Sequence, residues 1–224
     1  MKRFLRDNGL GLTFGLLFLA SLIGQAFAGN ADLNDHRLAD GGDPIGFWQY
    51  VASSDFAVDV AENWQSEYLQ FFLFIFATVW LMQKGSTESK TAERLGAESD
   101  RDQLLGAHLK QQSPPWAKAG GWRTKLYSNS LGLVMLGLFL GSWLTQSIAG
   151  RSQHNNDQLN TFQDPVSWWD YVLSADFWNR SLQNWQSEFL AIGSIAVLSV
   201  YLRQRGSSQS KPVGAPHDST DESG

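Results

Sequence analysis

The sequence contains the five residues Asn-Trp-Gln-Ser-Glu twice, at 63–67 and at 184–188, and each copy runs directly into an apolar segment. The offset of 121 residues between positions 63 and 184 aligns identical residues along the whole chain without a gap. A repeat of this kind predicts a chain built from two similar structural units. The aligned pairs include Gly11/Gly132, Ser21/Ser142, Gln25/Gln146, Asp43/Asp164, Pro44/Pro165, Trp48/Trp169, Tyr50/Tyr171, Asp55/Asp176 and Gly85/Gly206.

Apolar residues are concentrated in four blocks, at 10–28, 68–82, 131–149 and 189–202. A helix that crosses a membrane needs about 20 mostly apolar residues. The first and third blocks have this length, whereas the other two reach it only when the end of the preceding motif copy is included. The motif copies are therefore expected at the outer edge of a bilayer. The predicted transmembrane helices are at about 9–29, 64–83, 130–150 and 185–203.

The first apolar block has an alternative interpretation as a secretory signal peptide. Lys2, Arg3 and Arg6 precede it, and it ends in Ala-Phe-Ala at 26–28, which is similar to a cleavage site. The repeat favours a span, because the equivalent block at 131–149 lies inside the chain and has a similar end.

The distribution of basic residues predicts the orientation. Of the 17 Lys and Arg residues, three lie in the N-terminal tail, eight in the central linker and three in the C-terminal tail. Because cytoplasmic segments are enriched in Lys and Arg, both termini and the linker are expected in the cytoplasm. Two hairpins then follow one another and point the same way across the membrane.

A short helix is expected outside the membrane in each repeat. Asp43 followed by Pro44, and Asp164 followed by Pro165, suit a helix N-cap and first position. The aromatic residues that come next, such as Trp48 and its partner in the second repeat, are typical of a membrane interface. The preceding segment, at 29–42, is polar and is expected to be an irregular loop.

The predicted fold class is therefore all-α: a polytopic helical membrane protein with four transmembrane helices, arranged as two tandem parallel hairpin repeats with short outward interfacial helices. The linker is charged, and the tail is polar and is expected to be disordered. The predicted segments are 1–90 for the first repeat, 91–122 for the cytoplasmic linker, 123–206 for the second repeat and 207–224 for the tail.

Polar side chains mark a candidate site near the outer ends of the spans. Asn63, Ser66 and Glu67 share one helix face by three- and four-residue spacing. Gln25 is about one turn inside the first span, where an amide needs a hydrogen-bond partner, so we expect it to meet Glu67. The candidate polar cluster comprises Ser21, Gln25, Asn63, Gln65, Ser66, Glu67, Ser142, Gln146, Asn184, Gln186, Ser187 and Glu188.

Small residues recur at every fourth position of the first and third spans. Such a stripe lets helix backbones approach closely in lipid, so it predicts a packing seam between the repeats or between two copies of the chain. The residues of this small-residue stripe are Ala20, Gly24, Ala28, Gly137, Gly141, Thr145 and Ala149.

The residues that usually carry catalysis are scarce. The chain has no Cys and four scattered His residues, and it lacks a Gly-rich phosphate loop and a folded basic patch for nucleic acid. We therefore expect no enzyme, no cofactor and no metal. Ionisable residues within spans often mark ion pathways, so Glu67 and Glu188 favour a small transporter or ion channel as the alternative to a structural role.

Five further segments are distinctive: RFLRDNGL at 3–10, ENWQSEYL at 62–69, GS at 85–86, ESK at 88–90 and KPVGAPH at 211–217. With these segments the chain resembles an uncharacterised family of bacterial integral membrane proteins, known as a domain of unknown function. This resemblance implies a protein of the bacterial cytoplasmic (inner) membrane and supplies no activity. A non-enzymatic structural or assembly component of the cell envelope is the expected function, with the lipid bilayer and another copy or another membrane protein as partners.

Overall fold

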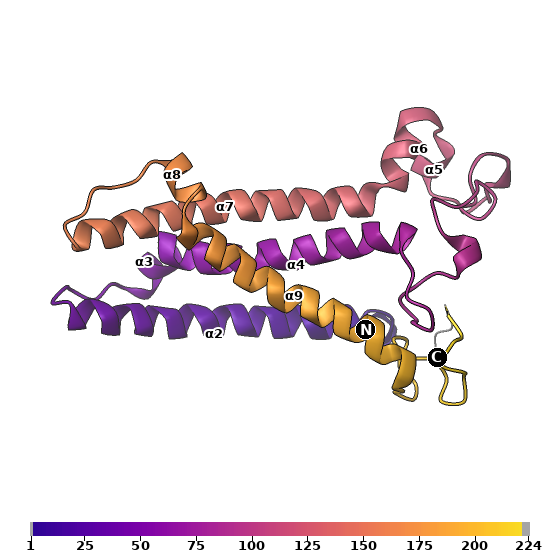
Figure 1. The fold of residues 1–224 in the computed structure, drawn as a ribbon, viewed down its shortest axis with the longest axis horizontal. Coiled ribbons are helices and arrows are strands. Elements are labelled where there is room, and N and C mark those ends of the chain that lie inside the picture. The colour runs from indigo at the N-terminus through magenta and orange to yellow at the C-terminus, as the bar shows by residue number, and fades with distance from the viewer. Residues whose placement is uncertain (1, 221–224) are drawn as a thin grey trace. The chain divides into compact units, whose positions relative to one another are not determined.

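The computed structural model describes residues 2–220, and these residues form helices, turns and no strand. The predicted all-α class is therefore confirmed. In chain order the helices are α1 (Lys2–Asp7), α2 (Gly9–Ala39), α3 (Phe47–Val51), α4 (Ser54–Trp80), the short 3₁₀ turns Ala92–Arg94 and Gly106–His108, α5 (Pro115–Lys118), α6 (Gly121–Ser128), α7 (Ser130–Asn160), α8 (Trp168–Val172) and α9 (Ala175–Tyr201) (Figure 1).

Helices of equal length recur in the two halves of the chain. Helices α2 and α7 each have 31 residues, α3 and α8 each have five, and α4 and α9 each have 27. Their first residues, 9 and 130, 47 and 168, and 54 and 175, differ by the same offset as the motif copies. Equivalent local sequences therefore form equivalent helices.

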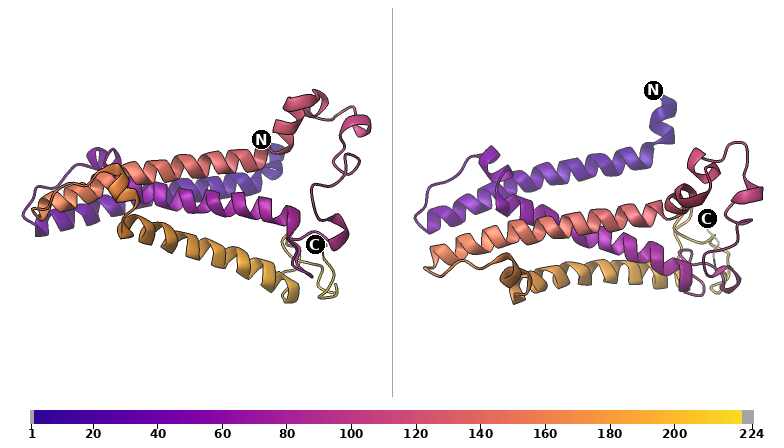
Figure 2. Two further views of the ribbon diagram at one scale, coloured as in Figure 1. Left: turned by 45° about the horizontal axis from the view of Figure 1, so that its top comes forward. Right: turned by 90° about the horizontal axis from the view of Figure 1, so that it is seen from above.

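Two of the described helices, α2 and α7, are long and apolar enough to cross a membrane. Their most apolar windows are only 6% and 11% buried, and both helices are continuous in all views (Figure 2). Helices α4 and α9 correspond to the other two predicted spans, but they lack an apolar stretch of sufficient length and hydropathy to cross a membrane by this measure. Each contains a polar motif copy, and α4 ends at Trp80, before the apolar residues Leu81 and Met82.

The segment expected as an irregular loop after the first span is largely helical. Helix α2 continues ten residues beyond position 29 and ends at Ala39. It stops where the chain reaches Gly41, whose φ of 78° lies in the left-handed region that favours glycine. Gly42 N donates to Arg37 O at 2.7 Å and completes this terminus.

The expected helix start at Asp43 and Pro44 is wrong by three to four residues. Helix α3 begins at Phe47, and α8 begins at the equivalent Trp168. Asn34 Oδ1 accepts a hydrogen bond from Ile45 N at 2.7 Å, and Asn34 Nδ2 donates to Ile45 O at 3.0 Å. Because both backbone groups of Ile45 are bound by a side chain, this residue stays outside the helix.

The chain divides into two compact units, the first of which comprises residues 2–61 and 145–172. In this unit α3 packs against α2, with the rings of Phe27 and Phe47 stacked at 4.5 Å. Tyr50 is buried and its hydroxyl contacts Gly29, and the equivalent Tyr171 contacts Gly150 in the same way. Glycine is needed at both positions because a Cβ atom would overlap the tyrosine.

The second unit comprises residues 62–144 and 173–220 as described. It contains most of α4, the whole of α9, the linker, the first half of α7 and the C-terminal tail. Ser174 Oγ caps α9 by accepting from Phe177 N at 3.3 Å. The buried Phe177 ring then packs against Trp143 of α7 at 5.6 Å.

Candidate functional site

The two motif copies contact one another within the second unit. Trp185 Nε1 donates to Gln65 Oε1 at 2.8 Å, and Ser66 Oγ donates to Glu188 Oε1 at 3.4 Å. Ser66 Oγ also bonds its own helix at Asn63 O, at 2.9 Å. Gln65 and Ser66 are buried, so the bond from Trp185 satisfies an amide oxygen that water does not reach, whereas Gln65 Nε2 has no hydrogen-bond partner among the described residues. The sequence predicts a contact of Glu67 with Gln25 and does not predict that the two motif copies contact one another.

An ion pair precedes the motif contacts by about one helical turn. Arg180 Nη1 lies 2.9 Å from Glu62 Oε1, and Arg180 Nε lies 3.6 Å from Asp176 Oδ1. The Glu62 side chain is only 14% exposed, which strengthens the pair relative to a fully solvated one. Sequence reasoning missed this pair, because Arg180 aligns with Asp59 and Glu62 aligns with Gln183, so the repeat does not preserve either charge.

The other residues of the candidate polar cluster have varied surroundings. Asn184 Nδ2 donates to Arg180 O at 3.1 Å and Ser187 Oγ donates to Asn184 O at 2.8 Å, so both bond their own helix. The charges of Glu67 and Glu188 are close enough to interact. Gln146 is buried, Gln25, Ser142, Asn184 and Glu188 are half-buried, and Ser21, Asn63, Glu67, Gln186 and Ser187 are exposed. The contact between Gln25 and Glu67 joins different units and stays a prediction.

Most of the small-residue stripe is exposed. A Cβ atom built on Gly24, Gly137 or Gly141 would meet no described atom within 4 Å. Ala20, Ala28 and Thr145 are also exposed, whereas Ala149 is buried. Packing of this stripe against another helix stays a prediction.

The structure reveals a second repeated cluster, which we call the lysine loops and define as residues 83–90 and 204–211. Their sequences are Gln-Lys-Gly-Ser-Thr-Glu-Ser-Lys and Gln-Arg-Gly-Ser-Ser-Gln-Ser-Lys. In the first loop Gln83 N donates to Ser89 Oγ at 2.9 Å, and in the second Gln204 N donates to Ser210 Oγ at 2.8 Å. The same turn thus follows α4 and α9.

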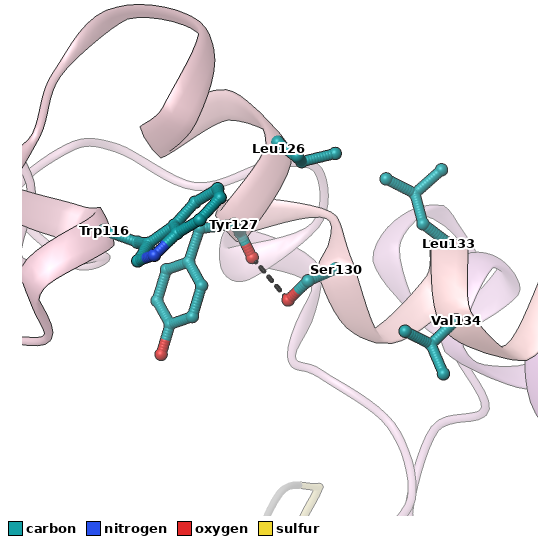
Figure 3. Close-up of a pocket in the computed structure, with 6 residues that line it drawn as sticks. All are labelled: Trp116, Leu126, Tyr127, Ser130, Leu133 and Val134. Carbon is teal, nitrogen blue, oxygen red and sulfur yellow. Dashed lines mark hydrogen bonds between the residues drawn. The ribbon is translucent and has the colours of Figure 1, made fainter.

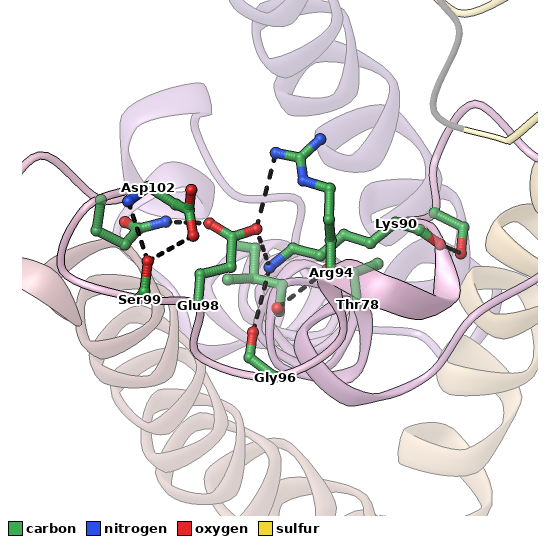
Figure 4. Close-up of polar contacts among 10 residues, drawn as sticks. Thr78, Lys90, Arg94, Gly96, Glu98, Ser99 and Asp102 are labelled. Atoms are coloured by element: carbon green, nitrogen blue, oxygen red, sulfur yellow. Dashed lines mark hydrogen bonds and ion pairs between the residues drawn. The ribbon is translucent and has the colours of Figure 1, made fainter.

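The lysine that ends each loop binds backbone carbonyl groups further along the chain. Lys90 Nζ donates to Gly96 O at 3.3 Å and pairs with Glu98 Oε1 at 2.9 Å (Figure 4). The Lys90 ammonium and the Gln103 amide lower the pKa of the Glu98 carboxyl. Lys211 is 1% exposed, and its Nζ donates to the carbonyl oxygens of Pro216, His217 and Ser219 at 3.1, 2.8 and 3.2 Å. Three carbonyl dipoles offset the cost of burying this charge.

The two lysine loops also contact each other and the tail. Ser86 Oγ lies 3.2 Å from Ser199 Oγ of α9, and Thr87 Oγ1 lies 3.4 Å from Gln209 O. Gly85 N donates to Thr220 Oγ1 at 2.9 Å. Residues 207–220 thus form turns with defined contacts where disorder is expected from composition, and residues 221–224 lie outside the described part. The two loops are separated by the same offset as the motif copies. The repeat could therefore have predicted them, but only the pair Gly85 and Gly206 was noted in the sequence.

The described residues form an all-helical protein with two helices that are long and apolar enough to cross a membrane. The polar side chains of its two clusters form hydrogen bonds and ion pairs with other residues of the same chain. Within residues 2–220 no group of three or more His, Asp or Glu side chains is placed to hold a metal ion. The chain belongs to the family described as a domain of unknown function (DUF6766), whose family model matches residues 1–222. The resemblance to an uncharacterised family is therefore confirmed. No curated protein and no solved structure matches the chain.

Proposed function

We propose that the protein is a multi-pass protein of the bacterial cytoplasmic membrane, with α2, α4, α7 and α9 as its four spans in two parallel hairpins and with both termini in the cytoplasm. The exposed apolar side chains of α2 support this location. Leu10, Phe14 and Leu16 are 77%, 64% and 68% exposed, which is unfavourable in water and favourable in lipid. The shorter apolar parts of α4 and α9 reach the outer surface through their motif copies.

Within the membrane the protein acts as a structural or assembly component and not as an enzyme. The observation that carries this proposal is the set of contacts between α4 and α9. Gln65 binds Trp185, Ser66 binds Glu188 and Glu62 binds Arg180, so these side chains bond each other. A transport pathway requires polar side chains at several depths, whereas these contacts are confined to the N-terminal halves of both helices. The contacts fix one helix against the other.

A small transporter or ion channel is the alternative, and the proximity of Glu67 and Glu188 favours it. Acidic side chains inside membrane helices often belong to ion or proton pathways. In a transporter the carboxyl groups of Glu67 and Glu188 must bind and release an ion or a proton, whereas in a structural role they need only form hydrogen bonds.

Replacing both acids by glutamine separates the two functions. Glutamine retains the size and the hydrogen-bonding capacity of glutamate but cannot release a proton. For a structural role, Glu67→Gln with Glu188→Gln should give a stably inserted protein whose ion flux in vesicles equals that of the unchanged protein. The exposed linker substitution Glu93→Gln is the matched control. A reproducible flux that the double substitution alone abolishes would establish the transporter.

A topology experiment tests the membrane arrangement. A reporter that is active only in the cytoplasm should give a signal after Gly85 and at the C-terminus, and none within residues 30–39. The mature chain should retain its N-terminal residues. A mature chain that begins near Gly29 would instead identify a cleaved signal peptide and remove the four-span arrangement.

Assembly through the small-residue stripe is a further part of the proposal. Gly141→Leu places a bulky side chain on the exposed stripe and should weaken association of the chain with itself. Leu138→Ile, on the same helix but outside the stripe, should have little effect. The molar mass of the protein in detergent measures both outcomes, and equal masses for the two variants would exclude this seam.

A further inference from the structure

The linker ends in a basic, aromatic segment immediately before α7. It contains Lys118, Arg123 and Lys125, and no Asp or Glu occurs between Asp102 and Asp157. Among the described ion pairs none involves Arg123 or Lys125. The positive charge of this segment is therefore not neutralised by an ion pair among the described residues.

An apolar pocket of about 480 Å³ lies beside this segment, where α5, α6 and the start of α7 meet (Figure 3). Ser130 Oγ donates to Tyr127 O at 2.7 Å, which leaves the pocket wall almost entirely apolar. A second hollow, of about 420 Å³, lies between the start of α7 and α4 and shares Leu133 with the first. The pocket is lined by Trp116, Leu126, Tyr127, Ser130, Leu133 and Val134.

Aromatic contacts connect the basic side chains with the pocket. The ring of Trp116, in the pocket wall, meets Trp122 edge to face at 6.3 Å, and the Arg123 guanidinium lies 5.6 Å from the centre of the Trp122 ring. Thr124 Oγ1 donates to Trp116 O at 2.9 Å and ties α6 to α5. By helical spacing Arg123 shares a face with Leu126 and Tyr127. The Arg123 cation is thus connected to the pocket wall through one intervening aromatic ring, that of Trp122.

We propose that this pocket binds an anionic phospholipid, with an acyl chain against Leu133 and Val134 and the phosphate against Arg123, while Lys125, on another face of α6, adds to the positive charge of the segment. Uncompensated cations attract anionic headgroups, and aromatic rings settle at the boundary between headgroups and acyl chains. Arg123 offers a planar donor set that suits a phosphate group. The position of the pocket at the first turn of α7 is where a membrane-crossing helix would meet that boundary, so the site rests on the proposed membrane location of α7.

Native mass spectrometry of the full chain in a non-ionic detergent tests this site. The protein should retain phosphatidylglycerol in preference to phosphatidylcholine. Arg123→Gln with Lys125→Gln should weaken phosphatidylglycerol binding roughly tenfold or more, since each cation near an anionic headgroup contributes about a factor of five. Lys84→Gln with Arg205→Gln removes the same charge from the lysine loops and should leave binding unchanged.

Two further outcomes decide what the pocket holds. Val134→Trp fills the pocket without changing the charge and should also reduce phosphatidylglycerol binding. If this variant instead separates a dimer while lipid binding is unaffected, a second copy of the chain occupies the pocket and the lipid site is excluded. Equal binding of the two lipids, or unchanged binding in the Arg123 and Lys125 variant, would also overturn it. Because the measurement is made in detergent, it is independent of the topology experiment.

Discussion

Asn34 binds Ile45 at both backbone groups, accepting from its N–H at 2.7 Å and donating to its C=O at 3.0 Å. Asn155 binds Val166 in the same way, at 2.8 and 3.1 Å. Each asparagine side chain therefore binds both the N–H and the C=O group of one loop residue. These bonds close the loop between a long helix and the short helix that follows. These contacts are shared by the segments that follow α2 and α7.

Asn155→Ala should open this loop. The change leaves Val166 N without its partner, whereas Arg151 Nε still donates to Val166 O at 3.2 Å. A lost hydrogen bond of this kind costs about 1–3 kcal/mol. Hydrogen exchange should become faster at the Val166 amide, with no change for Asn156→Ala at the adjacent exposed position. Unchanged protection in the Asn155 variant would mean that the loop holds without the amide.

Gly150→Ala should lower the stability of the protein, whereas Gly137→Ala should raise it or leave it unchanged, although both residues lie on α7. A Cβ atom at position 150 would overlap the buried Tyr171 hydroxyl and lie 3.0 Å from its Cζ, whereas at position 137 it would meet no described atom within 4 Å. Displacing a packed ring costs about 1–3 kcal/mol. Alanine at 137 should raise the melting temperature or leave it unchanged because it favours the helix. Thermal unfolding in detergent compares the two, and a stable Gly150 variant would contradict the contact.

The sequence alone predicts helices that correspond to α2, α3, α4, α7, α8 and α9, because apolar blocks and the repeat offset report local structure directly, whereas it does not predict α1, α5 and α6. It fails at Asp43 and Pro44, where cap chemistry favours a helix start and a tertiary contact prevents it. Asn34 occupies both backbone groups of Ile45, and no local pattern reveals a bond across eleven residues. The helix start therefore moves to Phe47.

The candidate site was predictable to the extent that it repeats. The motif copies stand out in the sequence, but the contacts of Gln65 with Trp185 and of Ser66 with Glu188 were not predicted. The pairing of Arg180 with Glu62 depends on how α9 crosses α4, which the sequence does not specify. The lysine loops are short and polar, and polar composition alone suggests disorder. Burial of Lys211 shows why composition misleads here, since carbonyl groups of the tail that follows the loop solvate the charge.

Tyr50 should make stability fall at alkaline pH. Burial raises the pKa of its hydroxyl above 10.0, and the nearby carboxylates of Asp59, Asp55 and Asp32 raise it further. A pKa that is higher in the folded state contributes stability that is fully present below the unfolded value and is lost as the pH rises through the folded value. The phenolate absorbance of the unchanged protein minus that of Tyr50→Phe should therefore titrate above pH 10.0. If the difference absorbance titrates at or below that pH, Tyr50 is not in the buried environment flanked by acidic side chains that the structure shows.

Lys211→Met should release the C-terminal tail. Methionine fits the length of the lysine but donates no hydrogen bond, so the carbonyl groups of Pro216, His217 and Ser219 lose their shared partner. The loss is expected to cost about 1–3 kcal/mol, because a buried acceptor left unpaired is not compensated by water. Limited proteolysis should then cut within residues 212–220, and their amide hydrogens should exchange faster. Arg205→Met, which removes an exposed cation from the same lysine loop, should leave the tail protected. Equal protection of the tail in both variants would show that the bonds from Lys211 do not hold it, and that the contact of Gly85 with Thr220 is sufficient.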